Sequence, residues 1–286
     1  MGVIYFCADD YGISKECNRR IEDCFKNGAL NKVSILPNGE ISDFRNELSG
    51  EGKVLSLHIN LVEGKPLSNP DDIDLLVTEN GCFKYSFVGL FLKSLSPKRR
   101  MLEKELYTEL KSQIKFWNEA MSSENRLSID SHQHTHMIPL VFKTLMRVIR
   151  DEGLKIDYIR IPEEPIWLYL STPSLYFDYS VSGVAKQWIL KVLSLINKKE
   201  LKKSGISYGC FMGAMFSGRL SEKKLNTMLP RYIKLAEKKN KCIEINFHPG
   251  YAEKGELTFE NRKSFEKFYL SSWRKREYDT LMKLKF

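Results

Sequence analysis

Short apolar runs alternate with amphipathic segments along this chain of 286 residues. The runs are rich in β-branched and aromatic residues and stop at Gly, Pro, Asn or Asp, a pattern that predicts buried strands. Strands are expected at residues 3–8, 33–36, 54–61, 129–136, 156–162, 208–212 and 242–250. The segments between them repeat apolar residues at helical spacing. Helices are expected at residues 14–27, 43–48, 102–121, 139–149, 184–197, 220–238 and 265–285.

This alternation of strands and helices predicts a mainly parallel sheet that is covered by helices. We expect the α/β class and a distorted (β/α) TIM-like barrel, with residues 1–286 forming a single domain. An open doubly wound sheet is the alternative, but no glycine-rich phosphate loop follows the first strand. Residues 68–98 and 163–204 are interpreted as excursions from the barrel that help to shape a substrate pocket.

Residues 129–136 hold three of the five histidines in the chain. In an extended strand His132, His134 and His136 point to the same face, because side chains alternate with a period of two. Neutral imidazole is the commonest protein ligand of zinc and similar ions, so this face is a candidate metal site. A histidine-rich surface strand without a function is the alternative interpretation.

Polar residues also stand at the ends of other expected strands. Asp9 and Asp10 follow the first strand, His58 lies near the end of the third, and Arg160 and His248 lie near the ends of two later strands. In a (β/α) barrel such ends meet at one face, where catalytic residues lie. The alternative for the two aspartates is a turn and helix-capping pair. Arg160 is expected either to pair with Asp9 or to form a structural salt bridge.

Composition narrows the expected partners and compartment. Lysine and arginine outnumber aspartate and glutamate by 45 to 36, and the net charge of +9 suits a polyanion or an anionic membrane surface. No nucleic-acid-binding motif accompanies this charge, so no nucleic acid partner is expected. Six scattered cysteines indicate a reducing cytoplasm. The sequence contains neither a signal-peptide pattern nor an apolar run as long as a membrane span.

Four ordered blocks of sequence resemble the YdjC-like carbohydrate deacetylases, a family that includes chito-oligosaccharide deacetylases. The blocks are residues 7–14 with Asn18 and Ile21, then 57–61, 130–136 and 247–250. Residues 159–165 also resemble the branch of the family associated with hopanoid biosynthesis. The resemblance covers residues 3–255. The chain departs from the family pattern at Cys7, where Asn is common, and at Tyr11, where Phe is usual.

The resemblance implies a distorted barrel that removes the acetyl group from an N-acetylated amino sugar with one divalent ion, Mg²⁺ or Zn²⁺. By motif position, Asp10, His58 and His132 are the implied metal ligands, Asp9 is the general base and His248 is the general acid. Three protein ligands leave a position open for a metal-bound water, which is expected to attack the amide carbonyl near neutral pH.

Three further residues, His134, His136 and Arg160, are expected to contact either the substrate or the metal ligands. The expected substrate is lipid-linked or oligomeric, because aromatic rings in the two excursions offer flat surfaces for sugars. The candidate rings are Tyr85, Phe87, Trp167 and Tyr169. The basic residues 198–203 are interpreted as a solvated helix end, with peripheral membrane contact as the alternative. A homodimer is also left open.

Two functions of other classes remain open from the sequence. One is a catalytically silent, metal-containing sugar-binding protein. The other is a barrel metallohydrolase that acts on a phosphoester, for which the basic net charge would suit an anionic substrate. Such phosphoesterases often use two metal ions and need more ligands. The number of bound ions per chain therefore separates the two kinds of hydrolase.

Overall fold

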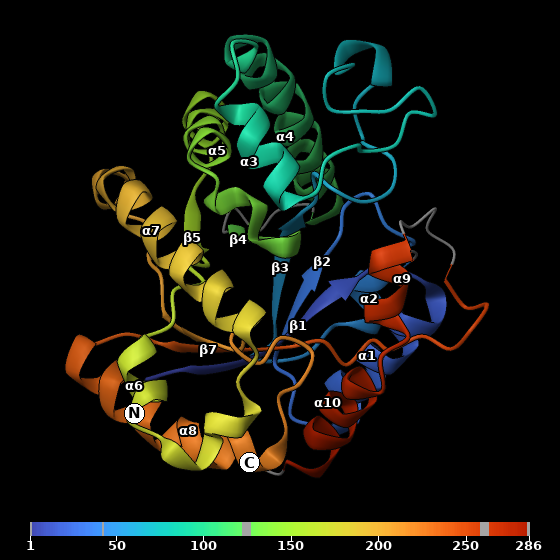
Figure 1. The fold of residues 1–286 in the computed structure, drawn as a ribbon. Coiled ribbons are helices and arrows are strands. Elements are labelled where there is room, and N and C mark those ends of the chain that lie inside the picture. The colour runs from blue at the N-terminus through green and yellow to red at the C-terminus, as the bar shows by residue number, and fades with distance from the viewer. Residues whose placement is uncertain (1, 42, 122–126, 258–262, 285–286) are drawn as a thin grey trace.

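Seven parallel strands form one curved sheet in the part of the chain that the computed structural model describes, residues 2–41, 43–121, 127–257 and 263–284 (Figure 1). The strands are β1 (Ile4–Tyr11), β2 (Lys32–Ile35), β3 (Val54–Ile59), β4 (Leu127–Ser131), β5 (Ile156–Ile159), β6 (Cys210–Met212) and β7 (Ile243–Phe247). All neighbouring pairs are parallel. The carboxyl ends of the strands therefore lie together at one edge.

The sheet curls into a distorted barrel, as predicted. Its strand order, β5-β4-β3-β2-β1-β7-β6, follows the chain around the sheet without the reversal of a doubly wound fold. The two outer strands, β5 and β6, are joined only through the segment before β6. There Tyr158 forms an isolated bridge with Ser207, and the Ile159 N–H donates to the Ser207 carbonyl at 3.0 Å. This weak seam distinguishes the fold from a fully closed barrel.

Helices surround the sheet (Figure 1). The α-helices are α1 (Lys15–Asn27), α2 (Phe44–Glu47), α3 (Phe87–Ser94), α4 (Arg99–Met121), α5 (Pro139–Asp151), α6 (Ile166–Leu170), α7 (Val181–Ser204), α8 (Glu222–Lys239), α9 (Lys263–Tyr269) and α10 (Ser272–Lys283). Three short 3-10 helices are η1 (Pro70–Asp72), η2 (His132–Met137) and η3 (Pro173–Asp178). Local sequence explains several boundaries: Ser14 caps α1 by accepting a hydrogen bond from the Cys17 N–H.

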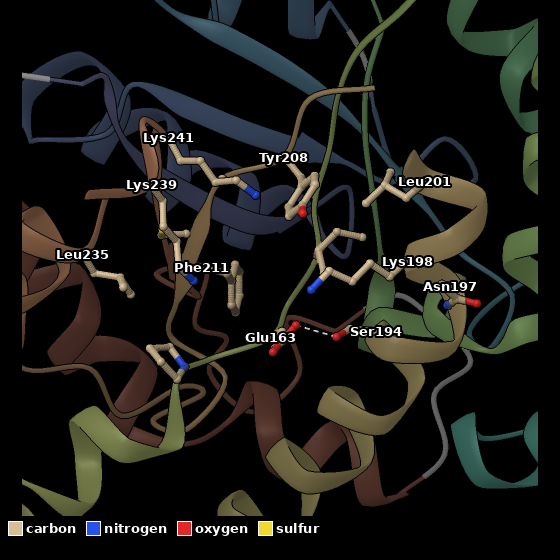
Figure 2. A pocket seen from close by; sticks show the side chains of 14 residues that line it. Glu163, Ser194, Asn197, Lys198, Leu201, Tyr208, Phe211, Leu235, Lys239 and Lys241 are labelled. Atoms are coloured by element: carbon tan, nitrogen blue, oxygen red, sulfur yellow. Dashed lines mark hydrogen bonds between the residues drawn. The ribbon is translucent and has the colours of Figure 1, made fainter. Parts of the chain in front are cut away.

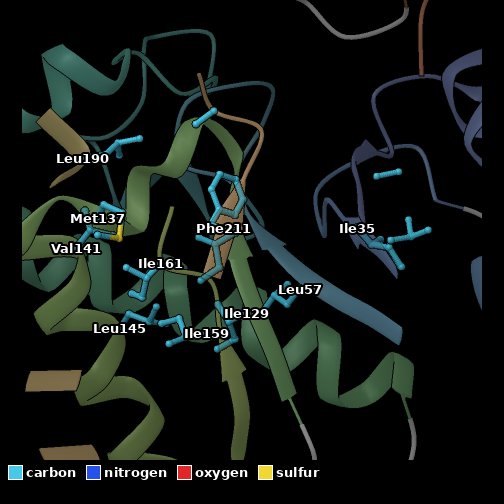
Figure 3. Packing of buried hydrophobic residues seen from close by; sticks show 14 of the residues in the cluster. Ile35, Leu57, Ile129, Met137, Val141, Leu145, Ile159, Ile161, Leu190 and Phe211 are labelled. Atoms are coloured by element: carbon cyan, nitrogen blue, oxygen red, sulfur yellow. The ribbon is translucent and has the colours of Figure 1, made fainter. Parts of the chain in front are cut away.

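The apolar positions that recur along strands and helices meet in the core. In Figure 3, Ile129 of β4 and Ile159 of β5 lie beside Leu145 and Val141 of α5. All four side chains are fully buried. The strand residues alternate with a period of two and the helix residues with a period near four, so each element turns one apolar face inward. This packing holds the strand ends in place for the site described below.

Two expectations about local structure are wrong. Residues 129–136 do not form one extended strand, because β4 ends at Ser131, where its pairing with β3 also ends. His132 begins η2, and Gln133 and His134 have positive φ angles of 53° and 60°. The three histidines therefore do not share a strand face. The helix expected at 265–285 is broken into α9 and α10, since Ser271 caps a new helix by accepting from the Trp273 N–H; Lys285 lies outside the described residues.

Both expected excursions contain helices of their own. Residues 68–98 include η1, an antiparallel bridge between Val77 and Phe83, and α3. Residues 163–204 include α6, η3 and the long helix α7, which begins before and ends after the predicted segment 184–197. Among the helices of the described residues, none is both long and apolar enough to cross a bilayer.

Candidate metal centre and active site

Two adjacent aspartates at the end of β1 serve different parts of the site. The pairing of β1 with β2 shifts by one residue between Ala8 and Tyr11, and Asp10 has a positive φ of 71°. A bulge of this kind breaks the alternation that would otherwise send neighbouring side chains to opposite faces. Asp9 and Asp10 are consequently both buried at the carboxyl edge of the sheet.

Asp10 lies between two histidines that come from other elements. Its Oδ1 is 2.8 Å from His132 Nδ1 and 3.6 Å from His58 Nε2. One ligand atom from each of the three residues lies within 4.8 Å of the others. Within the described residues, the His58 Nε2 atom is buried without a hydrogen-bond partner. A buried imidazole nitrogen that points at a carboxylate without a partner is suited to bind a metal ion.

The other ring nitrogen of each histidine contacts a second carboxylate. His58 Nδ1 lies 2.5 Å from Asp130 Oδ1, and His132 Nε2 hydrogen-bonds to Glu63 Oε2. The Tyr269 hydroxyl donates to the same Glu63 oxygen at 2.9 Å. Carboxylates on the outer ring nitrogen are typical of metal-binding histidines, because they fix the tautomer and the orientation of the ring.

The charge balance of the site also suits a divalent cation. The buried carboxylates are Asp9, Asp10, Glu63, Asp130 and Glu244, and the buried cations that pair with them are Lys32, Arg160 and Arg274. With all of these groups ionised and the histidines neutral, the site carries two excess negative charges.

The same carboxylates change the pKa of the two candidate ligand histidines. Burial lowers the pKa of both rings, but the carboxylates outweigh it and raise the pKa of His58 to about 9 and that of His132 to about 10. Protons on His58 and His132 therefore compete with a metal ion for the same ring nitrogens.

Arg160, directly after β5, joins three carboxylates beneath the metal centre. It binds Asp9 through two hydrogen bonds, with Nη1 donating to Oδ2 at 2.7 Å and Nη2 to Oδ1 at 2.9 Å. Its guanidinium also lies 3.2 Å from Asp130 and 2.6 Å from Glu244. Burial would raise the pKa of Asp9, but Arg160 and His58 hold it below its usual range. Both sequence interpretations of Arg160 therefore describe part of its environment.

His248 directly follows β7, the strand that lies between β1 and β6 in the sheet. The main-chain N–H of His248 donates to Glu277 Oε2 at 2.5 Å, and its Nδ1 lies 3.7 Å from the same oxygen. The ring packs edge-on against Phe268 with 5.6 Å between centroids. Glu277 of α10 also accepts from the Leu220 N–H at 2.6 Å, so one buried carboxylate anchors two loops. His248 Nδ1 itself has no hydrogen-bond partner in the part of the chain that the structure describes.

A cavity of about 550 Å³ opens onto these groups. Five of the predicted catalytic and ligand residues line it: Asp9, Asp10, His58, His132 and His248. Its volume lies in the range of ligand pockets. Apolar side chains form much of the remaining wall, namely Phe87, Val88, Ala185, Ile189, Leu190, Phe265 and Phe268. The cavity can thus hold an organic ligand against the polar cluster at its base.

A second cavity, of about 120 Å³, lies at the seam between β5 and β6 (Figure 2). Its wall includes Lys198, Lys239 and Lys241 together with Tyr208 and Glu163. Glu163 accepts a hydrogen bond from the Ser194 hydroxyl at 2.5 Å. None of the predicted catalytic or ligand residues lines this cavity. The larger cavity is therefore the candidate active site.

The other two histidines of η2 have different environments. His134 lines the larger cavity, and burial, with help from the charges of Lys186 and Arg160, lowers its pKa well below the usual range. His136 points away from the cavity lining: its Nε2–H donates to the Arg160 carbonyl at 2.7 Å, and its Nδ1 lies 2.5 Å from Ser131 Oγ. His134 can meet a ligand, whereas His136 holds the backbone of Arg160.

Only one of the four candidate sugar-stacking rings lines the cavity. Phe87 does so, but Tyr169 is buried and its hydroxyl lies 3.0 Å from the Tyr232 hydroxyl, which leaves no face for a sugar. The rings contributed by α9, Phe265 and Phe268, were not predicted as part of the site. They belong to a segment whose sequence shows only a basic, aromatic helix.

Several polar residues of the site were not predicted from the sequence. Glu63 follows β3 in Glu-Gly-Lys-Pro, which indicates a strand end rather than a ligand contact, and Asp130 precedes His132 without any distinguishing signal. Arg274 and Glu277 lie one turn apart on α10. Arg274 is 264 residues from Asp10, and Glu277 is 29 residues from His248 and 57 from Leu220. Arg274 Nη2 hydrogen-bonds to Asp10 Oδ2, and Arg274 Nη1 donates to the Gly250 carbonyl at 2.7 Å. Such pairs are visible only in the folded chain.

The fold and these residues define a distorted (β/α) barrel with a candidate divalent-metal centre at the carboxyl ends of its strands. The chain belongs to the YdjC-like protein family, whose model it matches over residues 3–286. The family predicted from the sequence blocks is thereby confirmed.

Curated relatives carry the names of deacetylases. A carbohydrate deacetylase of Danio rerio is 32% identical over 158 residues, which are 55% of this chain but only 49% of that protein. A carbohydrate deacetylase of Clostridium beijerinckii is 26% identical over 65% of this chain and 73% of its own length. A chitooligosaccharide deacetylase of Salmonella typhimurium is 30% identical over 54% of this chain and 59% of its own length. The match thus spans about half of the Danio rerio protein and less than two thirds of the Salmonella protein.

A solved structure resembles the whole fold. The crystal structure of an Enterococcus faecalis protein, provisionally described as a cellobiose-phosphate cleavage protein, superposes with a TM-score of 0.61. The superposition covers 98% of this chain and 90% of that one, at 16% sequence identity. At that identity the likeness concerns the fold, which many functions share.

The neutral state of His136 leads to a prediction about stability. Burial lowers the pKa of His136 from 6.5 to about 4, so the unfolded chain takes up a proton at a higher pH than the folded protein does. The difference in pKa stabilises the folded protein above pH 6.5, and this stabilisation is lost as the pH falls through 4. Between these values the free energy of unfolding should fall by about 3 kcal/mol more in the native protein than in His136→Gln.

Urea unfolding at a series of pH values measures this difference. Both proteins contain the same other titrating groups, so the variant serves as the control. Parallel stability curves for the two proteins would show that His136 does not titrate differently on folding.

Proposed function

We propose that this protein is a metal-dependent carbohydrate deacetylase that removes the acetyl group from an N-acetylated amino sugar. One observation carries the proposal: Asp10, His58 and His132 offer three ligand atoms within 4.8 Å of one another, at the base of a cavity that Asp9 and His248 also line. Membership of the YdjC-like family and the names of the relatives support the same activity.

We assign Asp10, His58 and His132 as the residues that hold one divalent ion, Mg²⁺ or Zn²⁺. When bound, such an ion acts as a Lewis acid that favours the attack of water on an amide carbonyl near neutral pH. The chain contributes the orientation of the ligands. Asp130 and Glu63 hold the outer nitrogens of the two histidines, and Arg274 binds the free oxygen of Asp10.

Asp9 takes the role of general base. Arg160 keeps its carboxylate ionised, and Asn246 Nδ2 donates a further hydrogen bond to Oδ2 at 3.0 Å. The Cys7 thiol, a weak donor, adds a long contact of 3.9 Å to Oδ1. A carboxylate offers about four lone-pair sites, so the three stronger hydrogen bonds leave capacity for a proton from water. The rigid clamp also holds the base beside the cavity, where its position relative to the attacked carbonyl is maintained.

His248 takes the role of general acid. The amine of a sugar leaves poorly unless it receives a proton, and imidazolium is a suitable donor at neutral pH. The Glu277 carboxylate lies 3.7 Å from His248 Nδ1 and accepts a hydrogen bond from the His248 main-chain N–H, so it holds this residue in place at the cavity. His248 follows β7, whereas Asp9 lies near the end of β1. Both residues line the same cavity, which allows one to accept a proton while the other donates.

The arrangement favours one metal ion over two. Further groups of potential ligands exist in the described residues, Asp9 with His58 and Asp130, and Cys7 with Asp130 and Glu244. Arg160 contacts members of both groups, so its guanidinium already supplies the positive charge there. A second cation next to Arg160 would be repelled. This disfavours the two-metal phosphoesterase.

The substrate we propose is an acetamido sugar that is part of a larger molecule, lipid-linked or oligomeric, met in the cytoplasm. The volume of the cavity is larger than an acetamido group alone requires. Part of its wall is formed by apolar side chains such as Phe87, Phe265 and Phe268. Apolar rings provide flat surfaces for sugars or lipid chains, while His134 and Lys186 offer polar contacts.

The activity is tested by acetate release. We expect acetate from chito-oligosaccharides and from a lipid-linked acetamido sugar, with a higher kcat/KM than for free N-acetylglucosamine, because remote parts of the substrate add binding energy. A coupled acetate assay on the metal-loaded protein measures it. Equal efficiency on all three substrates would rule out the larger acceptor, and hydrolysis of phosphoesters without acetate release would contradict the deacetylase.

Metal content tests the ligand assignment. The native protein should hold about one divalent ion per chain, and His58→Ala and His132→Ala should lose it, because each removes one of only three protein ligands. Elemental analysis after dialysis measures the stoichiometry. His136→Gln is the matched control, since His136 belongs to the same helical turn but is not assigned as a ligand. A full complement of metal in the His58→Ala, His132→Ala double variant would refute the assignment.

The acid and base are tested by kinetics at full metal loading. We expect Asp9→Asn and His248→Ala to lower kcat by about 10²- to 10⁴-fold while the metal stays bound. Metal analysis of the same preparations distinguishes a lost proton transfer from a lost ion. If either variant keeps the native turnover, that residue is not the group we assign.

A further inference from the structure

Two helices beside the cavity carry rows of exposed apolar side chains. On α7 these are Val181, Trp188, Ile189, Val192, Leu195 and Ile196, each about half exposed or more. On α3 they are Val88 and Leu92, together with Leu95 directly after the helix. The spacing of three, four or seven residues places each row on one face of its helix. We call these nine residues the apolar rim.

The part of the apolar rim on α7 is distinct from the face of this helix that packs against the core. The opposite face of α7 is buried through Leu190, Leu193 and Leu201. The helix is therefore apolar on two sides, one against the protein and one toward solvent. Monomeric soluble proteins rarely expose a contiguous apolar surface of this kind, and where they do it usually marks a binding site.

The apolar rim is continuous with the mouth of the active-site cavity. Val88 of α3 and Ile189 of α7 belong to the rim and also line the cavity. Both helices contact η2, which carries the ligand His132. A molecule that covers the rim would therefore lie directly over the entrance to the site.

Positive charge surrounds this apolar surface. The sequence of α7 contains six lysines and a single acidic residue, Glu200, and α3 has no acidic residue. Lys198, Lys199, Lys202 and Lys203 are exposed at the end of the apolar row of α7. Lys98, Arg99 and Arg100 are exposed directly after α3. Apolar side chains bordered by lysine and arginine match the layered chemistry of an anionic bilayer surface.

We propose that the apolar rim is a membrane-docking face, which inserts into the headgroup region of a bilayer that contains anionic lipids. Trp188 and the aliphatic residues enter the boundary of the acyl chains, while the lysines remain at the phosphate level. In this orientation the cavity mouth faces the lipid. The proposal does not depend on the deacetylase activity, because it rests on the surface of α3 and α7 alone.

Charge favours a bilayer over a second copy of the chain. A symmetric dimer through the apolar rim would place the same patch on both partners, so both sides of the interface would be positively charged, with six lysines and one acidic residue on each α7. Like charges next to a buried interface oppose association. An anionic bilayer instead attracts each of these lysines, by about fivefold in partitioning per residue near the surface at low salt.

Vesicle flotation tests the proposal. The native protein should float with vesicles of phosphatidylcholine and phosphatidylglycerol in low salt, and bind at least tenfold less to pure phosphatidylcholine. Val192→Glu together with Leu195→Glu should lower partitioning at least tenfold. Val3→Glu is the matched control, because Val3 is similarly exposed, 58% against 53% for Val192, but precedes β1 at the far end of the barrel.

A second pair of variants separates the charge from the apolar contact. Lys199→Gln with Lys202→Gln should weaken binding to anionic vesicles and reduce its salt dependence, whereas Lys26→Gln on α1 should not. Thermal unfolding of each variant verifies that it folds. Absence of vesicle binding by the native protein, or binding that Val192→Glu with Leu195→Glu leaves unchanged, overturns the proposal. It is also overturned if sedimentation shows a native dimer that these two substitutions dissociate, with no vesicle binding.

Discussion

The buried ion cluster around Arg160 is the interaction on which the rest of the structure depends. A single guanidinium, fully enclosed, pairs with Asp9 of β1, Asp130 of β4 and Glu244 of β7, and so ties together strands from both halves of the sheet. Removing one partner from such a cluster typically costs about 3 to 5 kcal/mol, because the remaining charges stay buried without compensation. Since β5 is joined to the segment before β6 by an isolated bridge in the described residues, these side-chain contacts inside the barrel help to hold a seam that the backbone leaves weak.

The same cluster divides the acidic residues of the barrel into two groups. Arg160 and Lys32 pair with those below the site, while Asp10 and Glu63 lie above with His58 and His132. Asp130 belongs to both groups, since one of its oxygens contacts His58 and the other contacts Arg160. With the carboxylates ionised, each group keeps one excess negative charge, since Lys32 and Arg160 face three carboxylates below and Arg274 faces two above. A protein that is strongly basic overall can in this way hold a cation at its centre.

The last two helices complete a site that the first strand begins. Arg274 of α10 contacts Asp10, and Glu277, one turn later, anchors the backbone of His248 and the loop after β6. Phe268 of α9 packs on the His248 ring and lines the cavity. On the other side, α3 and α7 supply apolar wall and an exposed apolar surface. The chemistry therefore comes from strand ends, whereas access to it is shaped by helices that the barrel itself does not require.

The sequence by itself determined the order of strands and helices, the family, and the residues that meet at the carboxyl edge, because periodicity and motif position depend on neighbours along the chain. Asp10, His58 and His132 were found in this way. Tertiary structure decided where β4 ends and which distant residues contact the site, neither of which follows from the spacing of residues along the chain. The strand at 129–136 stops at Ser131 because β3 has no more residues to pair with it, and the partners Glu63 and Arg274 reach His132 and Asp10 only through folding. A contact between residues far apart in the chain leaves no local pattern, so its existence depends on the packed barrel.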